Sequence, residues 1–366
     1  MCGIYLHIPF CKQACHYCNF HFSTSLKLQN DFLEALLKET ELRKDYTEGE
    51  SVTSIYFGGG TPSLLRSGDL ELIISTLKKT YPVSPYAEVT LEANPDDITS
   101  EALRSWKQIG INRLSIGIQS FFEEDLRWMN RAHSASQAAV CIPLAREAGF
   151  TNVTIDLIYG GPTLSDEKWK QNLSTAVSFR VPHLSCYALT VESKTPLDSM
   201  IKKKVVQNVS ADDQARQFQI MLSFLEENGY EQYEISNFSL PGKRSIHNSS
   251  YWSSAKYIGF GPSAHSYNGI SRQWNVANNA LYIQSLKNNS LQFEQEMLTS
   301  EQRFNEYIMT SLRTMEGADL LFIQNAFGKE YSEQLKKNAV RFFEKRWMKI
   351  ENEKLKGAVN TLRDGQ

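Results

Sequence analysis

Three cysteines lie within a short segment near the amino terminus, and this cluster constrains the chain more than any other feature. Cys11, Cys15 and Cys18 have the spacing C-x3-C-x2-C and follow an apolar run, residues 4–8, that is typical of a β-strand. The chain has six cysteines, so half of them fall in this segment. An isolated thiol packs as a small apolar side chain and has no reason to cluster, so the spacing indicates a shared chemical role.

Three kinds of site explain such a cluster. A disulfide leaves one cysteine over and needs an oxidising compartment, for which the first residues give no indication. Structural zinc prefers four tetrahedral ligands, and His16 or His21 would have to complete the set. A 4Fe-4S cluster is normally held by four thiolates, so three thiolates would leave one iron open to a substrate or cosubstrate.

Alternation of short apolar runs with helical patterns, up to about residue 190, predicts β–α units around a parallel sheet. We expect six strands that form a partial barrel with its helices on the outside. The expected strands are residues 4–8, 54–57, 88–92, 113–118, 153–158 and 183–189. Five helical patterns lie between them, and the fourth and fifth fall near residues 135–148 and 167–177.

Polar and glycine-rich residues follow most of these strands. In barrels of parallel strands the functional groups gather at the carboxyl ends, so these residues are predicted to face one site. They include the run Gly58-Gly59-Gly60-Thr61-Pro62, Glu92, Gln119 and Asp156. Arg131, a little further along, can bind a carboxylate through two hydrogen bonds, and Asp156 in an apolar strand needs a partner.

Strand alternation also gives an expectation for the first strand. Tyr5 and His7 share the face opposite to Ile4, Leu6 and Ile8, so they are predicted to point into the barrel. His7 is then either a cavity-lining residue or a core histidine with hydrogen-bond partners.

Beyond residue 190 the alternation stops. Residues 212–229 read as a long helix, residues 233–238 as an added strand, and residues 257–267 as a glycine-containing loop that carries His265. Between them lies the string His247-Asn248-Ser249-Ser250-Tyr251-Trp252, which by itself predicts only a loop anchored by aromatic side chains. Residues 301–315 and 320–327 are predicted helices, and residues 347–350 a strand before a polar tail.

The charge balance limits the classes of partner. The chain has 39 basic and 41 acidic residues, a formal charge of −2, which offers no electrostatic case for nucleic acid. No uncharged apolar run reaches 18 residues, so we expect a soluble, cytoplasmic protein, with peripheral membrane contact left open. Cys141 and Cys186 lie in apolar contexts typical of burial, whereas Cys2 is expected to be exposed.

The cysteine spacing resembles the radical S-adenosylmethionine (SAM) superfamily, in which three thiolates hold a 4Fe-4S cluster and the fourth iron takes the amino and carboxylate groups of SAM. The motif HIPFC, together with Tyr17 and Asn19-Phe20, resembles the corresponding motifs of the HemN and HemW branch of that superfamily. Phe20 stands where the oxidase HemN typically has a further cysteine, and in this respect the sequence is similar to HemW.

The resemblance implies a three-part organisation. Residues 1–235 would form an α/β, partial (β/α)6 radical-SAM barrel, residues 236–290 a connecting segment with added helix and strand, and residues 291–366 a small, mainly helical, winged-helix-like domain. The tail after Lys356 fits the family pattern poorly, which leaves the wing open. Cys11, Cys15 and Cys18 would hold the cluster. The implied SAM contacts are Tyr5, Gly59, Gly60, Thr61, Glu92, Gln119, Arg131, Asp156 and Tyr187.

The resemblance also implies a function. The HNxxYW string is similar to the signature that the heme chaperones associate with heme binding, which makes His247, Tyr251 and Trp252 candidate heme contacts and His265 a reserve ligand. The expected protein binds heme, a 4Fe-4S cluster and SAM, passes heme to an acceptor protein, for instance a respiratory one, and draws electrons from a flavodoxin or ferredoxin. The alternative is an enzyme, the oxygen-independent coproporphyrinogen III dehydrogenase. Phe20 and the ten residues that precede Cys11, too few for that enzyme's N-terminal extension, favour the chaperone.

Overall fold

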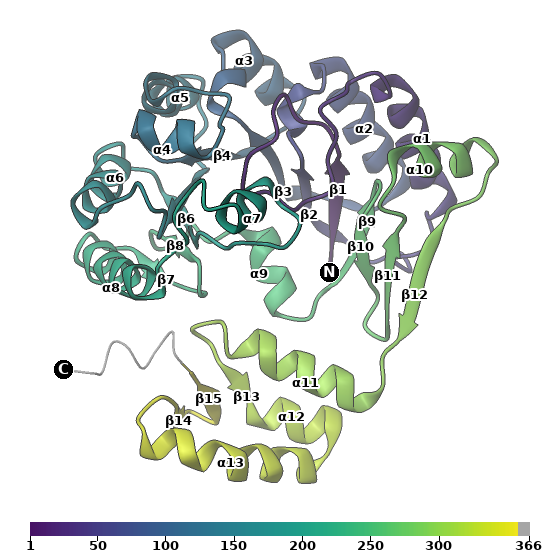
Figure 1. Cartoon of the computed structure of the whole chain (residues 1–366). Coiled ribbons are helices and arrows are strands. Elements are labelled where there is room, and N and C mark those ends of the chain that lie inside the picture. The colour runs from purple at the N-terminus through teal and green to yellow at the C-terminus, as the bar shows by residue number, and fades with distance from the viewer. Residues whose placement is uncertain (358–366) are drawn as a thin grey trace.

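The chain folds around one large mixed sheet, described for residues 1–357 by a computed structural model (Figure 1). The sheet has the strand order β12-β11-β10-β9-β1-β2-β3-β4-β5-β6-β8-β7. Strands β1 to β6 pair in parallel, and β9 pairs in parallel with the other side of β1. The remaining strands extend both edges in antiparallel pairing.

The strands of this sheet are short at the edges and longest in the parallel centre. Their bounds are β1 Cys2–Ile8, β2 Val52–Gly59, β3 Val83–Ala93, β4 Arg113–Gln119, β5 Val153–Tyr159, β6 His183–Ala188, β7 Glu231–Gln232, β8 Asn237–Ser239, β9 Lys256–Phe260, β10 His265–Tyr267, β11 Ser271–Asn275 and β12 Phe293–Met297.

Most helices cover the outer face of the sheet, one packs against its inner face, and three more form a separate layer beneath it (Figure 1). Their bounds are α1 Gln29–Leu42, α2 Ser67–Thr80, α3 Ser100–Gln108, α4 Glu123–Trp128, α5 Ala135–Glu147, α6 Asp166–Ser178, α7 Pro196–Lys202, α8 Ala211–Glu227, α9 Ile246–Trp252, α10 Asn279–Lys287, α11 Ser300–Ser311, α12 Leu320–Phe327 and α13 Lys329–Glu344.

The apolar pattern of the strands explains why the helices lie outside. Ile4, Leu6 and Ile8 on one face of β1 are fully buried and belong to the same core as Phe32 and Leu36 of α1. The alternate residues of the strand face the barrel interior, where polar groups gather. The predicted partial barrel of six parallel strands with outer helices is confirmed, and β9 adds a seventh parallel strand that the sequence did not indicate.

Several local expectations are wrong. Residues 233–238 do not form one strand, because the chain turns between β7 and β8. Residues 257–267 are not a mobile loop but the two strands β9 and β10. The string from His247 to Trp252 lies in the helix α9. Cys2 is buried in β1 rather than exposed, whereas Cys141 and Cys186 are buried as expected.

The C-terminal part has the element order of a winged helix. Helices α11, α12 and α13 pack on a three-stranded sheet of order β13-β15-β14, with β13 Ala318–Asp319, β14 Lys349–Glu351 and β15 Lys354–Lys356. A small core of its own, around Leu320, Ile323 and Leu355, holds these elements together. The antiparallel pair β14 and β15 forms the wing, so the wing is present, and the tail at 358–366 lies outside the described residues. The division of the chain at residues 235 and 290 stays a prediction.

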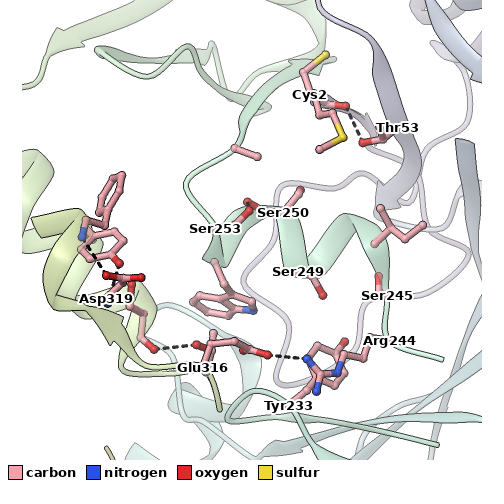
Figure 2. A pocket seen from close by; sticks show the side chains of 18 of the residues that line it. Cys2, Thr53, Tyr233, Arg244, Ser245, Ser249, Ser250, Ser253, Glu316 and Asp319 are labelled. Carbon is pink, nitrogen blue, oxygen red and sulfur yellow. Dashed lines mark hydrogen bonds and ion pairs between the residues drawn. The ribbon is translucent and has the colours of Figure 1, made fainter. Parts of the chain in front are cut away.

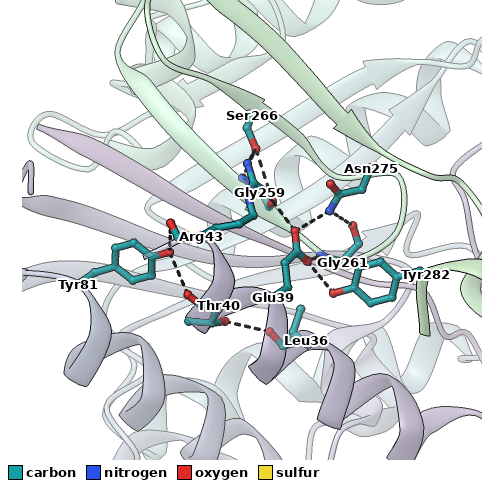
Figure 3. Close-up of polar contacts among 10 residues, drawn as sticks. All are labelled: Leu36, Glu39, Thr40, Arg43, Tyr81, Gly259, Gly261, Ser266, Asn275 and Tyr282. Carbon is teal, nitrogen blue, oxygen red and sulfur yellow. Dashed lines mark hydrogen bonds and ion pairs between the residues drawn. The ribbon is translucent and has the colours of Figure 1, made fainter. Parts of the chain in front are cut away.

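A buried ion pair fastens the antiparallel extension to the barrel (Figure 3). Glu39 of α1 is fully buried and accepts hydrogen bonds from Arg43, at 3.0 Å, from Tyr282 and Asn275, and from the backbone amide of Gly261. Arg43 also donates to Ser266 Oγ and to the carbonyl of Gly259. Both carboxylate oxygens of Glu39 therefore accept hydrogen bonds, and the guanidinium of Arg43 has a carboxylate and two neutral acceptors, which is the condition under which a buried pair is tolerated.

We expect the substitution Glu39→Gln to lower the free energy of unfolding by about 3 to 5 kcal/mol, because it leaves the buried guanidinium of Arg43 without its counter-charge. Urea unfolding followed by circular dichroism measures the change. The matched control is Glu41→Gln in the same helix, where the carboxylate is 69% exposed and we expect a change within about 0.5 kcal/mol. Equal unfolding midpoints for the two variants would contradict this account.

Candidate cofactor site at the carboxyl end of the barrel

A cavity of about 470 Å³ opens at the carboxyl ends of the parallel strands. All three clustered cysteines line it. Eight of the nine predicted SAM contacts line it as well, namely Gly59, Gly60, Thr61, Glu92, Gln119, Arg131, Asp156 and Tyr187. Residues from six parallel strands, β1 to β6, and their loops therefore converge on one space, as the parallel topology requires.

The loop that carries the cysteines is irregular, and its backbone is fixed by hydrogen bonds within the loop and to two other segments. Near its start, Thr61 N donates to Phe10 O at 2.7 Å and Cys11 N to Ser23 O at 3.0 Å. In its middle, His16 N donates to Met129 O, and the side chain of Asn130 donates to Ala14 O. The cysteines are thus held in place before any cofactor binds.

Gly60 allows the backbone of the turn after β2 to approach the backbone of residues 8–10 more closely than any residue with a side chain would. A Cβ atom at this position would lie 2.6 Å from the carbonyl oxygen of Phe10 and 2.8 Å from that of Ile8. Its own amide donates to Ile8 O at 2.8 Å. The glycine run therefore lets the turn after β2 pack directly against the start of the cysteine loop.

Arg131 places a positive charge beside the cysteines. Its Nη1 lies 3.4 Å from Cys15 Sγ and 3.4 Å from the hydroxyl of Tyr17, and its Nη2 donates to Asn94 Oδ1 at 2.7 Å and to Gly117 O. Within residues 1–357 no carboxylate lies at ion-pair distance from it, and its buried Nε has no hydrogen-bond partner. A guanidinium held in this way suits an anionic group in the cavity, such as a thiolate cluster or a carboxylate.

Two carboxyl groups line the same cavity in a partly dehydrated setting. Burial raises the pKa of Glu92 to about 7, against the opposing effect of the hydrogen bond from Tyr56, which donates to Glu92 Oε1 at 2.7 Å. Burial likewise raises the pKa of Asp156 to about 6, and its bonds with Ser185 and Ser115 oppose the shift. Both groups are able to accept hydrogen bonds from hydroxyls or an ammonium group once they are ionised.

Gln119 ends β4 in an unusual conformation. Its φ is +63°, in the left-handed region, and the pairing with β5 shifts register between Ile116 and Gln119. Such a bulge bends the strand and re-aims a side chain, and strained positions of this kind cluster at functional sites. The strain therefore agrees with a ligand-contacting role for Gln119.

The thiols fit an iron–sulfur cluster better than a zinc ion. The two candidate fourth zinc ligands, His16 and His21, do not line the cavity that the three cysteines share. In the described part of the chain no three groups of the types His, Cys, Asp and Glu converge on a point where one metal ion would sit. A cubane does not need such convergence, because each thiolate binds a different iron. Burial raises the pKa of Cys11 to about 11, so cluster binding has to release thiol protons.

The remaining predicted residues lie elsewhere. Tyr5, the ninth predicted SAM contact, is absent from the lining of the cavity; its hydroxyl lies 3.3 Å from His7 Nδ1, and its ring stacks on Tyr56. His7 is buried, with its Nε2 2.8 Å from His21 O, so it is a core histidine with partners. His265 is exposed on β10 and stacks on Trp274.

The candidate heme contacts are divided between two sides of α9. His247 is only 1% exposed, and its ring nitrogens lie 2.9 Å from Ser54 Oγ and 3.0 Å from the hydroxyl of Tyr251. Burial lowers its pKa to about 3, so the imidazole is neutral. Trp252 lines a different cavity, on the far side of α9.

Three residues that complete the site had no role in it assigned from the sequence. Asn94 fixes Arg131 and also lines the cavity, and Tyr17 contacts the same guanidinium. Ser115 also lines the cavity. It precedes Gly117 by two residues and Gln119 by four on β4, so the three residues share one face of the strand. This alternation could have identified Ser115 from the sequence.

Comparisons with known proteins agree with this geometry. The pattern of the radical SAM superfamily matches residues 5–176, and the barrel with its three-cysteine loop defines a protein of that class. The protein called heme chaperone HemW of Bacillus subtilis is 33% identical over 92% of this chain and 88% of its own length. Those of Mycobacterium tuberculosis H37Rv and Escherichia coli are 34% and 36% identical over 87% and 72% of this chain, and over 83% and 69% of their own lengths. The chain therefore belongs to the HemW family.

Among solved structures, coproporphyrinogen III oxidase (HemN) of Escherichia coli matches 98% of this chain and 87% of its own, with a TM-score of 0.85 and 22% identity. At that identity the likeness concerns the fold, including the C-terminal part.

We expect Gly60→Ala to reduce the cluster content of anaerobically reconstituted protein to less than half of about four irons per chain, because the added methyl group pushes the cysteine loop away from β2. Iron analysis and the visible absorption spectrum measure the loss, with Cys15→Ala as the reference for a missing ligand. Gly161→Ala is the control, since its Cβ would meet only Leu189 at 3.8 Å. A full cluster in Gly60→Ala would contradict the proposed loop contact.

SAM binding to the reconstituted protein should weaken as the pH falls from about 8 to about 6. The raised pKa of Glu92, about 7, means that its accepting carboxylate form is lost by protonation within this range. In Glu92→Gln, affinity at pH 8 should fall by about tenfold and most of the pH dependence should disappear, leaving the titration of Asp156 near pH 6. Equilibrium dialysis with labelled SAM measures both, and Glu101→Gln, at an exposed position of α3, should behave as the parent protein.

Proposed function

We propose that this protein is a heme chaperone that binds a 4Fe-4S cluster, SAM and heme and transfers heme to an acceptor protein. The observation that carries the proposal is the meeting of Cys11, Cys15 and Cys18 with eight predicted SAM contacts in one cavity. Membership of a family whose curated relatives are named heme chaperone HemW supports the heme-transfer part.

In this proposal the three cysteines are the cluster ligands, and the remaining lining residues receive SAM. A bound cluster supplies one open iron and a reducing electron for SAM. Arg131 neutralises the anionic ligands beside Cys15, Glu92 and Asp156 accept hydrogen bonds from SAM, and Gly59 and Gly60 give SAM access to the backbone. The tyrosine hydroxyl of Tyr56 keeps the Glu92 carboxyl oriented into the cavity.

His247, Tyr251 and Trp252 remain the candidate heme contacts of the HNxxYW string. For His247 to ligate heme iron, its imidazole would have to give up its contact with Ser54 or with Tyr251, which occupy both ring nitrogens. Trp252, by contrast, is half-buried and faces a cavity.

Partners follow from the same proposal. They are heme, a heme-acceptor protein and an electron donor such as a flavodoxin or ferredoxin, with no nucleic acid. Within residues 1–357 no helix has the length and apolar character needed to cross a membrane. A cytoplasmic location, with peripheral membrane contact where an acceptor requires it, is part of the proposal.

The alternative function is the oxygen-independent coproporphyrinogen III dehydrogenase. The likeness of the whole chain to the HemN fold is the observation in its favour. Phe20, which lines the cavity where that enzyme typically has an additional cysteine, speaks against it.

Two assays on anaerobically reconstituted protein test the proposed function. Hemin titration should give a shifted Soret band, and mixing the loaded protein with an apo-acceptor hemoprotein should move the heme to the acceptor. Incubation with SAM, a reductant and coproporphyrinogen III should release no carbon dioxide above the level of Cys15→Ala. Absence of heme binding together with decarboxylation would replace the chaperone with the enzyme.

A further inference from the structure

Figure 2 shows a second cavity, of about 880 Å³. It lies at the opposite end of the barrel from the cofactor site. Cys2, Thr53 and Ser84, at or near the amino-terminal ends of β1, β2 and β3, form part of its wall, whereas the cofactor site lies at the carboxyl ends. Helix α9 forms a second wall, and Tyr307 of α11 and Phe322 of α12 form the wall on the C-terminal side. We call this space the α9 cleft.

Helix α9 has two faces with different environments. Ile246, Ser249, Ser250 and Ser253 have the spacing i, i+3, i+4 and i+7 and line the α9 cleft. His247 and Tyr251, also four residues apart, lie on the other face and bond to each other within the barrel. The backbone amide of His247 donates to Glu88 of β3 at 3.1 Å, which fastens this inner face to the sheet.

The α9 cleft has the size and lining for a large flat ligand. Its volume lies in the range of sites that enclose drug-sized or larger molecules. The small side chains of the α9 serines leave space along one wall of the cleft. The rings of Trp252, Tyr307 and Phe322 line the cleft as well and can stack on a flat ligand. Such a surface favours a broad aromatic macrocycle over an extended peptide.

Positive charge lies at the edge of this cleft. Arg244 and Lys354 line it, and Arg313 lies 5.9 Å above the ring of Trp252. The two acidic side chains nearby have other partners: Glu316 pairs with Arg244 at 2.7 Å, and Asp319 accepts from the backbone amides of Leu321 and Phe322. Arg244 is thereby neutralised by Glu316 and Glu231, whereas neither Lys354 nor Arg313 forms an ion pair within the described residues. Lys354 and Arg313 are therefore the cations that complement a ligand with carboxylate groups, and heme carries two propionates.

We propose that the α9 cleft is the heme site, with the porphyrin against Trp252 and the serine face of α9, and that His247 positions α9 from inside the barrel. This proposal rests on the proposed function and adds the location to it. Heme and SAM then occupy opposite ends of the barrel and bind at the same time. Among the described residues that line the cleft there is no histidine, so the imidazole of His247 is not an iron ligand in this arrangement.

Hemin titration of the full-length reconstituted protein tests the location. Ser249→Trp fills the cleft from α9 and should weaken hemin binding by at least about tenfold, while iron content and SAM binding stay unchanged. Ser290→Trp, the same change at an exposed position after α10, should leave hemin affinity unchanged. Trp252→Ala should weaken binding to a similar degree, and Trp252→Phe should restore most of it.

Two further measurements separate this proposal from its alternatives. The affinity for hemin in the presence of saturating SAM should lie within about twofold of the affinity without SAM. The Soret band of the hemin complex should have the same position in His247→Gln as in the parent protein. Parental hemin affinity in a folded Ser249→Trp, competition between SAM and hemin, or a Soret shift in His247→Gln would each overturn the location but leave the chaperone function standing. Failure of the parent protein to bind hemin at all would overturn both.

Discussion

The pairing of β1 on both of its edges is the constraint on which the rest of the structure depends. Parallel ladders to β2 and to β9 fix its direction and register, and its apolar face is fully buried under the helices. Because the strand is fixed, the loop that follows it always starts at the same point of the barrel rim. Its other face, with Tyr5 and His7, is left to the polar interior.

The cysteine loop itself has no regular secondary structure, so its shape comes from its neighbours. The end of β2 supplies the amides of Gly60 and Thr61, and residues after α4 supply Met129 and Asn130. The position of the three thiols on one cavity therefore depends on two segments that are distant in sequence. This explains why a short, irregular segment can hold ligands in place, since loops carry function when a rigid scaffold positions them.

Sequence patterns predicted the barrel and most of the site because both follow from periodicity and from strand ends. Glu92 and Asp156 stood out as carboxylates at or near the end of apolar strands, and the structure shows them on one cavity. The β9–β10 segment was missed because its glycines suggested mobility. Gly259 is instead required by packing, since a Cβ there would lie 2.2 Å from the carbonyl oxygen of His265, and Gly261 has φ +99° beside His7 O. Such demands arise from chain segments that are far apart, and no local pattern reveals them.

The orientation of α9 could not be predicted from the sequence either, and it changes how the string from His247 to Trp252 is interpreted. A histidine and a tyrosine four residues apart on a helix share one face whatever that face contacts. Here the face contacts the barrel: the ring of His247 stacks on Tyr56 at 4.9 Å, and Tyr56 donates to Glu92 in the cofactor cavity. One continuous set of contacts thus runs from the cofactor cavity to the helix that walls the α9 cleft. His247 and Tyr251 of the string are therefore explained first as the attachment of α9 to the barrel, whereas Ser249, Ser250 and Trp252 of the same string line the α9 cleft.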